Sequence, residues 1–136
     1  MRAILSLPLF LYLMIVANVL MLGRAPGDPS MINAILFELP LPSGREVPIT
    51  VSDALILTAI VFLYFETFKA TRTSVISIID HSVSLFVFIV FLVEFMVVPQ
   101  VGNTTFLILT VASLLDVVMG FTVTISTARR DLAVGG

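Results

Sequence analysis

Asp116 lies near the middle of residues 106–126, an apolar stretch that has no other charged residue and is long enough to cross a bilayer. A charged carboxylate at the centre of a membrane helix costs about 2.5–3.5 kcal/mol on insertion scales, so such a residue usually has a partner or a functional task. Two kinds of chemistry fit an acid in this position. It can hold helices together by hydrogen bonding, which is the interpretation we prefer, or it can exchange a proton or bind a cation during transport.

A second apolar stretch, residues 75–98, carries Asp80, His81 and Glu94. In a helix centred on the bilayer, Asp80 and His81 would lie about 8–10 Å on the cytoplasmic side of the centre, and Glu94 about 11 Å on the other side. Separations of this size from Asp116 exceed the reach of a hydrogen bond, so a proton relay would need bridging water. We therefore interpret Asp80 and His81 as an interfacial polar pair, and Glu94 as a group that reaches water or the outer connection.

Glu66 and Lys69 lie three residues apart near the cytoplasmic end of the preceding predicted helix. This spacing is typical of a solvated ion pair on a helix surface. Because a short link joins this helix to the next, either Lys69 or Arg72 could also pair with Asp80.

Small and polar side chains form one stripe on each of two predicted helices, at the three- and four-residue spacing of a helix face. The stripe on residues 75–98 contains Ser77 and Ser84, and the stripe on residues 104–127 contains Thr110, Ser113, Gly120 and Thr124. Small residues let membrane helices approach closely, and hydroxyls can hydrogen-bond between them. We expect the two stripes to face each other or a shared partner, with Asp116 directed toward protein rather than lipid.

The residue types exclude several kinds of site. The chain has no cysteine, which excludes disulfides and thiolate chemistry, and it carries no enzyme or phosphate-binding motif, so we predict no catalytic residues and no metal site. Asp80 and Asp116 could form a paired-acid protease site, but about 10 Å in depth separates them. No cofactor is predicted, although His81 could supply one axial ligand to a haem or pigment. A net charge of −2 with no basic run argues against nucleic-acid binding.

Hydropathy predicts the elements that must position these side chains. The chain is 59% hydrophobic and 12% charged, compared with about 45–50% and about 25% in soluble domains, and its mean hydropathy is +1.16. We expect membrane spans at about residues 3–22, 51–68, 75–98 and 104–127, since each needs about 20 apolar residues. The first stretch is longer than the core of a secretory signal, which favours a retained helix. The predicted fold is an all-α membrane protein with a single four-helix domain over residues 1–136.

Residues 34–51, between the first two spans, predict a short β-like hairpin with a turn at residues 42–45. Its apolar side chains at alternate positions are Phe37, Leu39, Leu41, Val47 and Ile49. An isolated two-stranded hairpin is marginal in water, so we expect it to lie against the helix ends, the membrane surface or another protein. Thr50 and Asp53 have the spacing of a capping box at the start of the second span.

The distribution of basic residues predicts the orientation. Arg2, Lys69, Arg72, Arg129 and Arg130 fall on the side of the termini, whereas Arg24 and Arg45 fall in the connection after the first span. Because positive charge favours the cytoplasmic side, both termini are expected there. We expect an integral protein of a membrane such as the bacterial inner membrane.

Three functions remain after these exclusions. Because the chain offers little mass outside the spans and no catalytic signature, we expect a small accessory or structural subunit of a larger membrane complex or of a homo-oligomer. Its partners would be the lipid bilayer and other membrane subunits or copies of itself. The alternative is a small proton or cation transporter or channel that uses the intramembrane acids. A weaker alternative is a pigment- or haem-binding subunit that uses His81.

Overall fold

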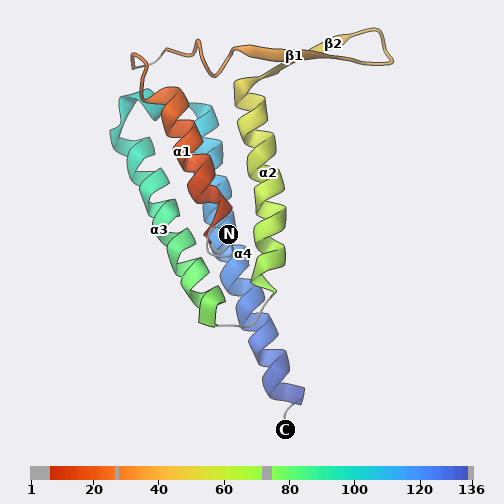
Figure 1. Cartoon of the computed structure of the whole chain (residues 1–136), viewed down its shortest axis with the longest axis vertical. Helices are drawn as coiled ribbons and strands as arrows, with labels where there is room; N and C mark the ends of the chain where they lie inside the picture. The colour runs from red at the N-terminus through yellow and green to blue at the C-terminus, as the bar shows by residue number, and fades with distance from the viewer. Residues whose placement is uncertain (1–6, 27, 72–74, 135–136) are drawn as a thin grey trace.

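The computed structural model describes residues 7–26, 28–71 and 75–134 (Figure 1). Within these ranges, only the backbone is described for residues 75–78, 127–128 and 130–134. The described chain is mostly helical, with one small antiparallel hairpin. Its elements are α1 (Leu9–Met21), β1 (Ile35–Pro40), β2 (Glu46–Thr50), α2 (Val51–Ala70), α3 (Val75–Val97), the short 3₁₀ helix η2 (Pro99–Val101) and α4 (Thr104–Val134).

Three of the four α-helices are long and apolar enough to cross a membrane. The spans that meet this condition are Val51–Ala70, Ile79–Val97 and Thr104–Ser126. The first helix, α1, is also apolar but has only 13 residues, and residues 3–6 of the first predicted span lie outside the described part of the chain. In the α2 span only 17% of the residues are buried, so most of its apolar side chains face outward. They need lipid or another protein to cover them.

Local sequence signals explain where α2 begins and where α3 ends. The Thr50 hydroxyl accepts a hydrogen bond from the Asp53 amide at 3.2 Å, and the Asp53 carboxylate accepts one from the Thr50 amide at 2.9 Å. This confirms the predicted capping box. Helix α3 ends at Val97, just before Pro99, which cannot continue a helical hydrogen-bond ladder.

The apolar core lies in the half of the bundle nearer to the hairpin. Helix α4 packs along both α2 and α3, and α1 lies across α2 and α3 on the near side in Figure 1. The core side chains are Phe10, Leu13, Ala17 and Met21 of α1, Leu55 and Ala59 of α2, Val87 and Phe91 of α3, Val101 of η2, and Phe106 and Leu109 of α4.

The predicted hairpin is confirmed as a two-stranded antiparallel sheet in which Phe37 pairs with Ile49 and Leu39 with Val47. Its turn uses Gly44 at a φ of 78°, a conformation that glycine adopts without strain. Figure 1 shows the hairpin extending sideways beyond the end of α2, across the direction of the helices. The strands are exposed along most of their length, so beyond its base the hairpin does not rest on the helix ends of this chain. The reason is the direct join of β2 to α2, which leaves no linker for folding back.

Candidate functional site

Lys69 stands at the centre of a polar cluster between α2 and α3. Its Nζ atom lies 2.9 Å from Glu66 Oε2 and 3.1 Å from Asp80 Oδ2. Glu66 is 3% exposed and Asp80 8% exposed, whereas the Lys69 side chain keeps 25% of its surface. One ammonium group therefore forms ion pairs with two buried carboxyl groups. Of the two predicted partners of Asp80, Lys69 is confirmed, and Arg72 lies outside the described residues. The expectation that Glu66 is solvated is wrong.

The N-terminal end of α1 buries Glu66. The Leu9 amide donates a hydrogen bond to Glu66 Oε1 at 2.6 Å, and Lys69 Nζ donates one to the Leu7 carbonyl oxygen at 3.3 Å. Pro8 occupies the N-cap position and makes no side-chain cap. The amides of a first helical turn have no partner within the helix, and a carboxylate also suits the positive end of the helix dipole. Glu66 of α2 thus caps the start of α1. The only sign of this role in the sequence is that Pro8 cannot supply a side-chain cap.

Asp116 of α4 is 5% exposed and faces the interior of the bundle. Its side-chain hydrogen-bond partner is Ser84 of α3, itself 3% exposed. The second carboxylate oxygen, Oδ2, is buried and has no hydrogen-bond partner among the described residues. Among the acids of the site, Asp116 is therefore the one with a buried carboxylate oxygen that has no hydrogen-bond partner among the described residues.

His81 joins α3 to α4 on a neighbouring face. Its Nε2 atom lies 2.9 Å from the Thr124 hydroxyl, and its ring lies 5.6 Å from that of Phe121, measured between centroids. At Gly120, an added Cβ atom would lie 2.6 Å from His81 Nδ1, closer than such atoms can approach. Gly120 therefore makes room for the imidazole, and the polar stripes of α3 and α4 meet here.

The other predicted side chains lie elsewhere. Glu94 accepts a hydrogen bond from Asn18 Nδ2 at 2.9 Å, near the hairpin end of α1 and α3. Thr110 and Ser113 are buried, but their hydroxyls donate to the carbonyl oxygens of Phe106 and Thr110 in their own helix, both at 2.8 Å. They contribute to packing by small size rather than by bonds between helices. The Ser77 side chain lies outside the described residues.

An apolar layer separates the Asn18–Glu94 pair from the cluster around Lys69. On α1 the buried side chains between these polar groups are apolar: Phe10, Leu13 and Ala17. On α3 the buried polar side chains His81 and Ser84 come first after Asp80, and the buried side chains from there to Glu94 are Val87 and Phe91. On α4 this layer continues through Leu109 and Phe106, whose ring lies 5.3 Å from that of Phe91. On α4 the buried Thr110 and Ser113 lie between Leu109 and Asp116 in the sequence, and their hydroxyls bond within the helix.

The chemistry available to the cluster is charge neutralisation, hydrogen bonding and proton exchange. Among the described residues, no group of three or more His, Asp or Glu side chains is arranged to hold a metal ion. The chain matches no protein-family model, no curated protein and no solved structure, so the case for a function rests on this geometry.

Proposed function

We propose that the protein is a small integral-membrane subunit that assembles with another membrane protein or with copies of itself, and that the hairpin is its docking element. The observation that carries this proposal is the exposed apolar face of the hairpin. Phe37 is 56% exposed and Leu39 46% exposed, and their cross-strand partners are Ile49 and Val47. Because side chains alternate between the faces of a strand, these four share one face.

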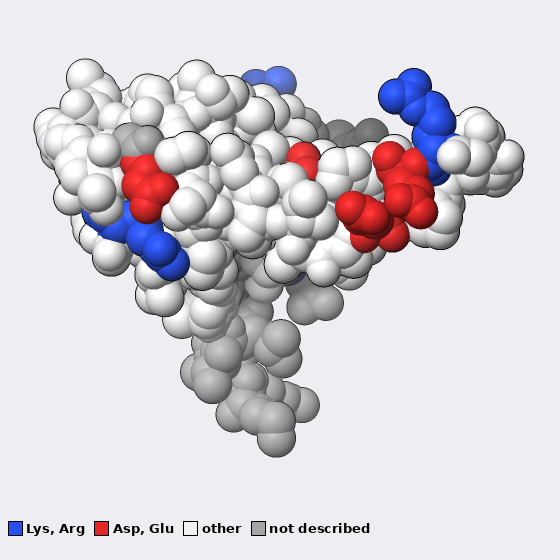
Figure 2. All heavy atoms as spheres, turned by 90° about the horizontal axis from the view of Figure 1, so that it is seen from above, with Lys and Arg blue, Asp and Glu red and all other residues white. Residues whose placement is uncertain are grey.

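The opposite face of the hairpin has a different character. There Glu38 pairs with Pro48, and Pro40 with Glu46. Figure 2, which views the hairpin end of the molecule, shows acidic side chains gathered beside a basic one toward the tip of the hairpin. A second small charged group lies far from it, and one further acidic patch is visible between them. A ribbon with one apolar and one acidic face can dock by the first while the second remains in water.

Phe37→Asp should release the partner or lower the mass of the oligomer while leaving membrane insertion intact. The change places a charge at the centre of the apolar face, and the spans are untouched. Size-exclusion chromatography with light scattering, in a mild detergent, measures the mass. Glu38→Gln, on the opposite face of the same strand, is the matched control and should leave the mass unchanged. An unchanged mass and an unchanged set of co-purifying proteins for Phe37→Asp would contradict the docking role.

We further propose four membrane spans with both termini in the cytoplasm. The helices alternate in direction, with α1 and α3 running toward the hairpin end and α2 and α4 away from it (Figure 1). The distribution of Lys and Arg supports an orientation in which the hairpin lies outside. Because the chain has no cysteine, Ser43→Cys should react with an impermeant thiol reagent added from outside, and Ala133→Cys should react only after the membrane is opened. Labelling of Ala133→Cys in intact cells would overturn the orientation.

A second candidate function is proton or cation handling at Asp116. The observation that favours it is the buried Oδ2 atom, which has no hydrogen-bond partner among the described residues and lies beside a cluster with two further acids. The apolar layer on the hairpin side of the cluster weighs against it, because a transported ion would have to cross that layer. A haem or pigment role for His81 stays a prediction that an absorption spectrum of the purified protein tests, and it would require breaking the bond to Thr124.

A further inference from the structure

An apolar groove of about 470 Å³ runs between α1 and α2 beneath the base of the hairpin. Its lining residues are Tyr12, Leu13, Val16 and Leu20 of α1, Met31, Leu36 of β1, and Val51, Ala54, Leu55, Thr58 and Phe62 of α2. None of these described residues is Asp, Glu, Lys or Arg. The volume is within the range of about 300–1,000 Å³ found for small-molecule sites.

The depth of the groove matches one leaflet of a bilayer. Along α2 it extends from Val51, the first residue of the helix, to Phe62, a distance of about 16 Å at the helical rise. The hydrocarbon core of a bilayer is about 30 Å thick, so one leaflet accounts for about 15 Å. With α2 crossing the bilayer from Val51 to Ala70, the groove would begin near the level of the lipid headgroups and end near the centre of the membrane.

A cation lies at the mouth of the groove. The Arg24 Nη2 atom lies 3.9 Å from the sulfur atom of Met31, which lines the groove, and the Arg24 side chain is exposed. A guanidinium group can bind two oxygens of a phosphate at once. Asp28 interacts electrostatically with Arg24, and a hydrogen bond from the Ser30 amide at 2.9 Å lowers the pKa of Asp28. Asp28 is therefore charged at neutral pH and competes with a phosphate for Arg24.

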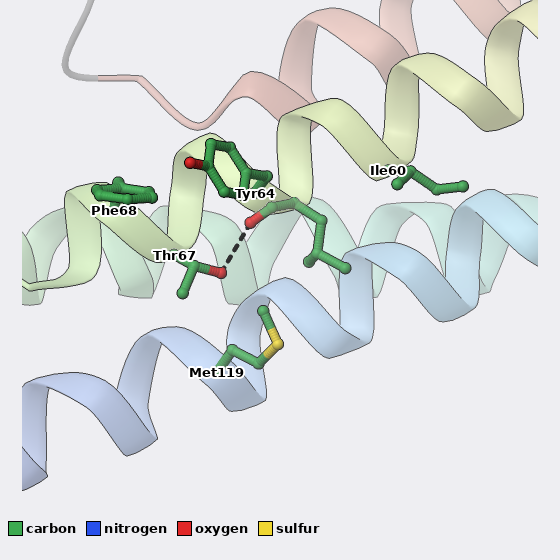
Figure 3. Close-up of a pocket in the computed structure, with 6 residues that line it drawn as sticks. Ile60, Tyr64, Thr67, Phe68 and Met119 are labelled. Carbon is green, nitrogen blue, oxygen red and sulfur yellow. Dashed lines mark hydrogen bonds between the residues drawn. The ribbon is translucent and has the colours of Figure 1, made fainter.

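A second hollow, between α2 and α4, lacks this combination. It has a volume of about 340 Å³ and is lined by Ile60, Leu63, Tyr64, Thr67, Phe68 and Met119. Figure 3 shows the Thr67 hydroxyl bonded to the Leu63 carbonyl within α2, at 2.8 Å. Neither Lys nor Arg is among its described lining residues, so it provides an internal control for unspecific contact with lipid.

We propose that the groove between α1 and α2 binds one acyl chain of a phospholipid from the leaflet on the hairpin side, and that Arg24 binds the phosphate of the same lipid. The apolar lining, the depth of one leaflet and the cation at the mouth each fit a different part of such a molecule. The binding site requires membrane insertion but is independent of any partner of the hairpin.

Tyrosine fluorescence can test the site, because the chain contains two tyrosines and no tryptophan. Tyr12 lines the groove and Tyr64 lines the control hollow. Tyr64→Phe leaves Tyr12 as the only emitter, and Tyr12→Phe leaves Tyr64. A phosphatidylglycerol brominated on its acyl chains, titrated into detergent micelles that contain the protein, should quench Tyr12 with saturation near one lipid per chain. The quenching of Tyr64 should instead rise in proportion to the lipid concentration, without saturation.

Variants in the Tyr64→Phe background separate the parts of the site. Arg24→Gln should weaken the saturable binding by about tenfold, the size expected for loss of a charge-assisted hydrogen bond, and Asp28→Asn should strengthen it. Ala54→Phe should fill the groove and abolish saturation, whereas Ile60→Phe, in the control hollow, should not.

Equal concentration dependence for the two tyrosines, or an unchanged affinity in Arg24→Gln, would overturn the proposal. So would a loss of oligomer mass in Ala54→Phe with unchanged quenching, since the groove would then be a protein contact.

Discussion

Lys69→Met should lower the free energy of unfolding by about 3–5 kcal/mol, the range for removing one partner of a buried ion pair. Methionine preserves most of the side-chain volume but leaves Glu66 and Asp80 buried with no cation, and both acids lose a contact of about 3 Å. The hydrogen bond from Lys69 to the Leu7 carbonyl is lost as well. The N-terminal end of α1 should therefore be the first part to detach from α2. Unfolding in mixed micelles with increasing sodium dodecyl sulfate, followed by circular dichroism, measures the change.

Two further variants show whether charge or volume is responsible. Lys69→Arg keeps a cation and should recover most of the stability. Adding Glu66→Gln and Asp80→Asn to Lys69→Met removes the two unpaired charges and should restore much of the loss. If Lys69→Met alone costs less than about 1 kcal/mol, the value typical of exposed pairs, then the cluster is solvated and the buried geometry does not govern stability.

Asp116→Leu should lower the free energy of unfolding by about 1–2 kcal/mol on model-peptide scales. Leucine removes the hydrogen bond to Ser84, a residue that is 3% exposed, and so leaves a buried hydroxyl without this partner. Asp116→Asn retains the ability to hydrogen-bond and should be tolerated. The same unfolding assay compares the two, with Leu115→Ala, on the exposed face of α4, as the control for a change that lies outside the bundle.

The same pair of Asp116 variants decides between the two candidate functions. An assembly subunit should show no proton or cation flux in vesicles, and Asp116→Asn should then keep both its stability and its oligomer mass. A transporter that uses Asp116 should show flux in the native protein and none in Asp116→Asn, because an amide cannot exchange a proton at neutral pH. Flux that disappears in Asp116→Asn with the fold intact would overturn the assembly proposal.

The polar cluster shows where reasoning from depth alone fails. Treating each span as an isolated rod centred on the bilayer leaves Glu66 in solvent. In the folded chain Glu66 is buried by the N-terminal end of α1, and its partner, the Leu9 amide, lies 57 residues away in sequence. Vertical offset and rotation of the helices produce this contact, and neither quantity can be read from the period of one helix. The hydrogen bond between Ser84 and Asp116, by contrast, agrees with the predicted facing of the two polar stripes.

Local features, by contrast, follow from residues close together in the chain. Helices α2, α3 and α4 can be predicted from the apolar residue types of their segments. The hairpin follows from alternating apolar residues around a Pro-Ser-Gly turn, and the capping box follows from the spacing of Thr50 and Asp53. The tertiary structure decided which polar groups share an environment, that the hairpin leaves the bundle sideways, and that a groove lies between α1 and α2. The physical reason is that hydropathy and backbone hydrogen bonding act over a few residues. Burial of a particular side chain instead depends on which distant helix packs over it, and that depends on the fit of whole helix faces.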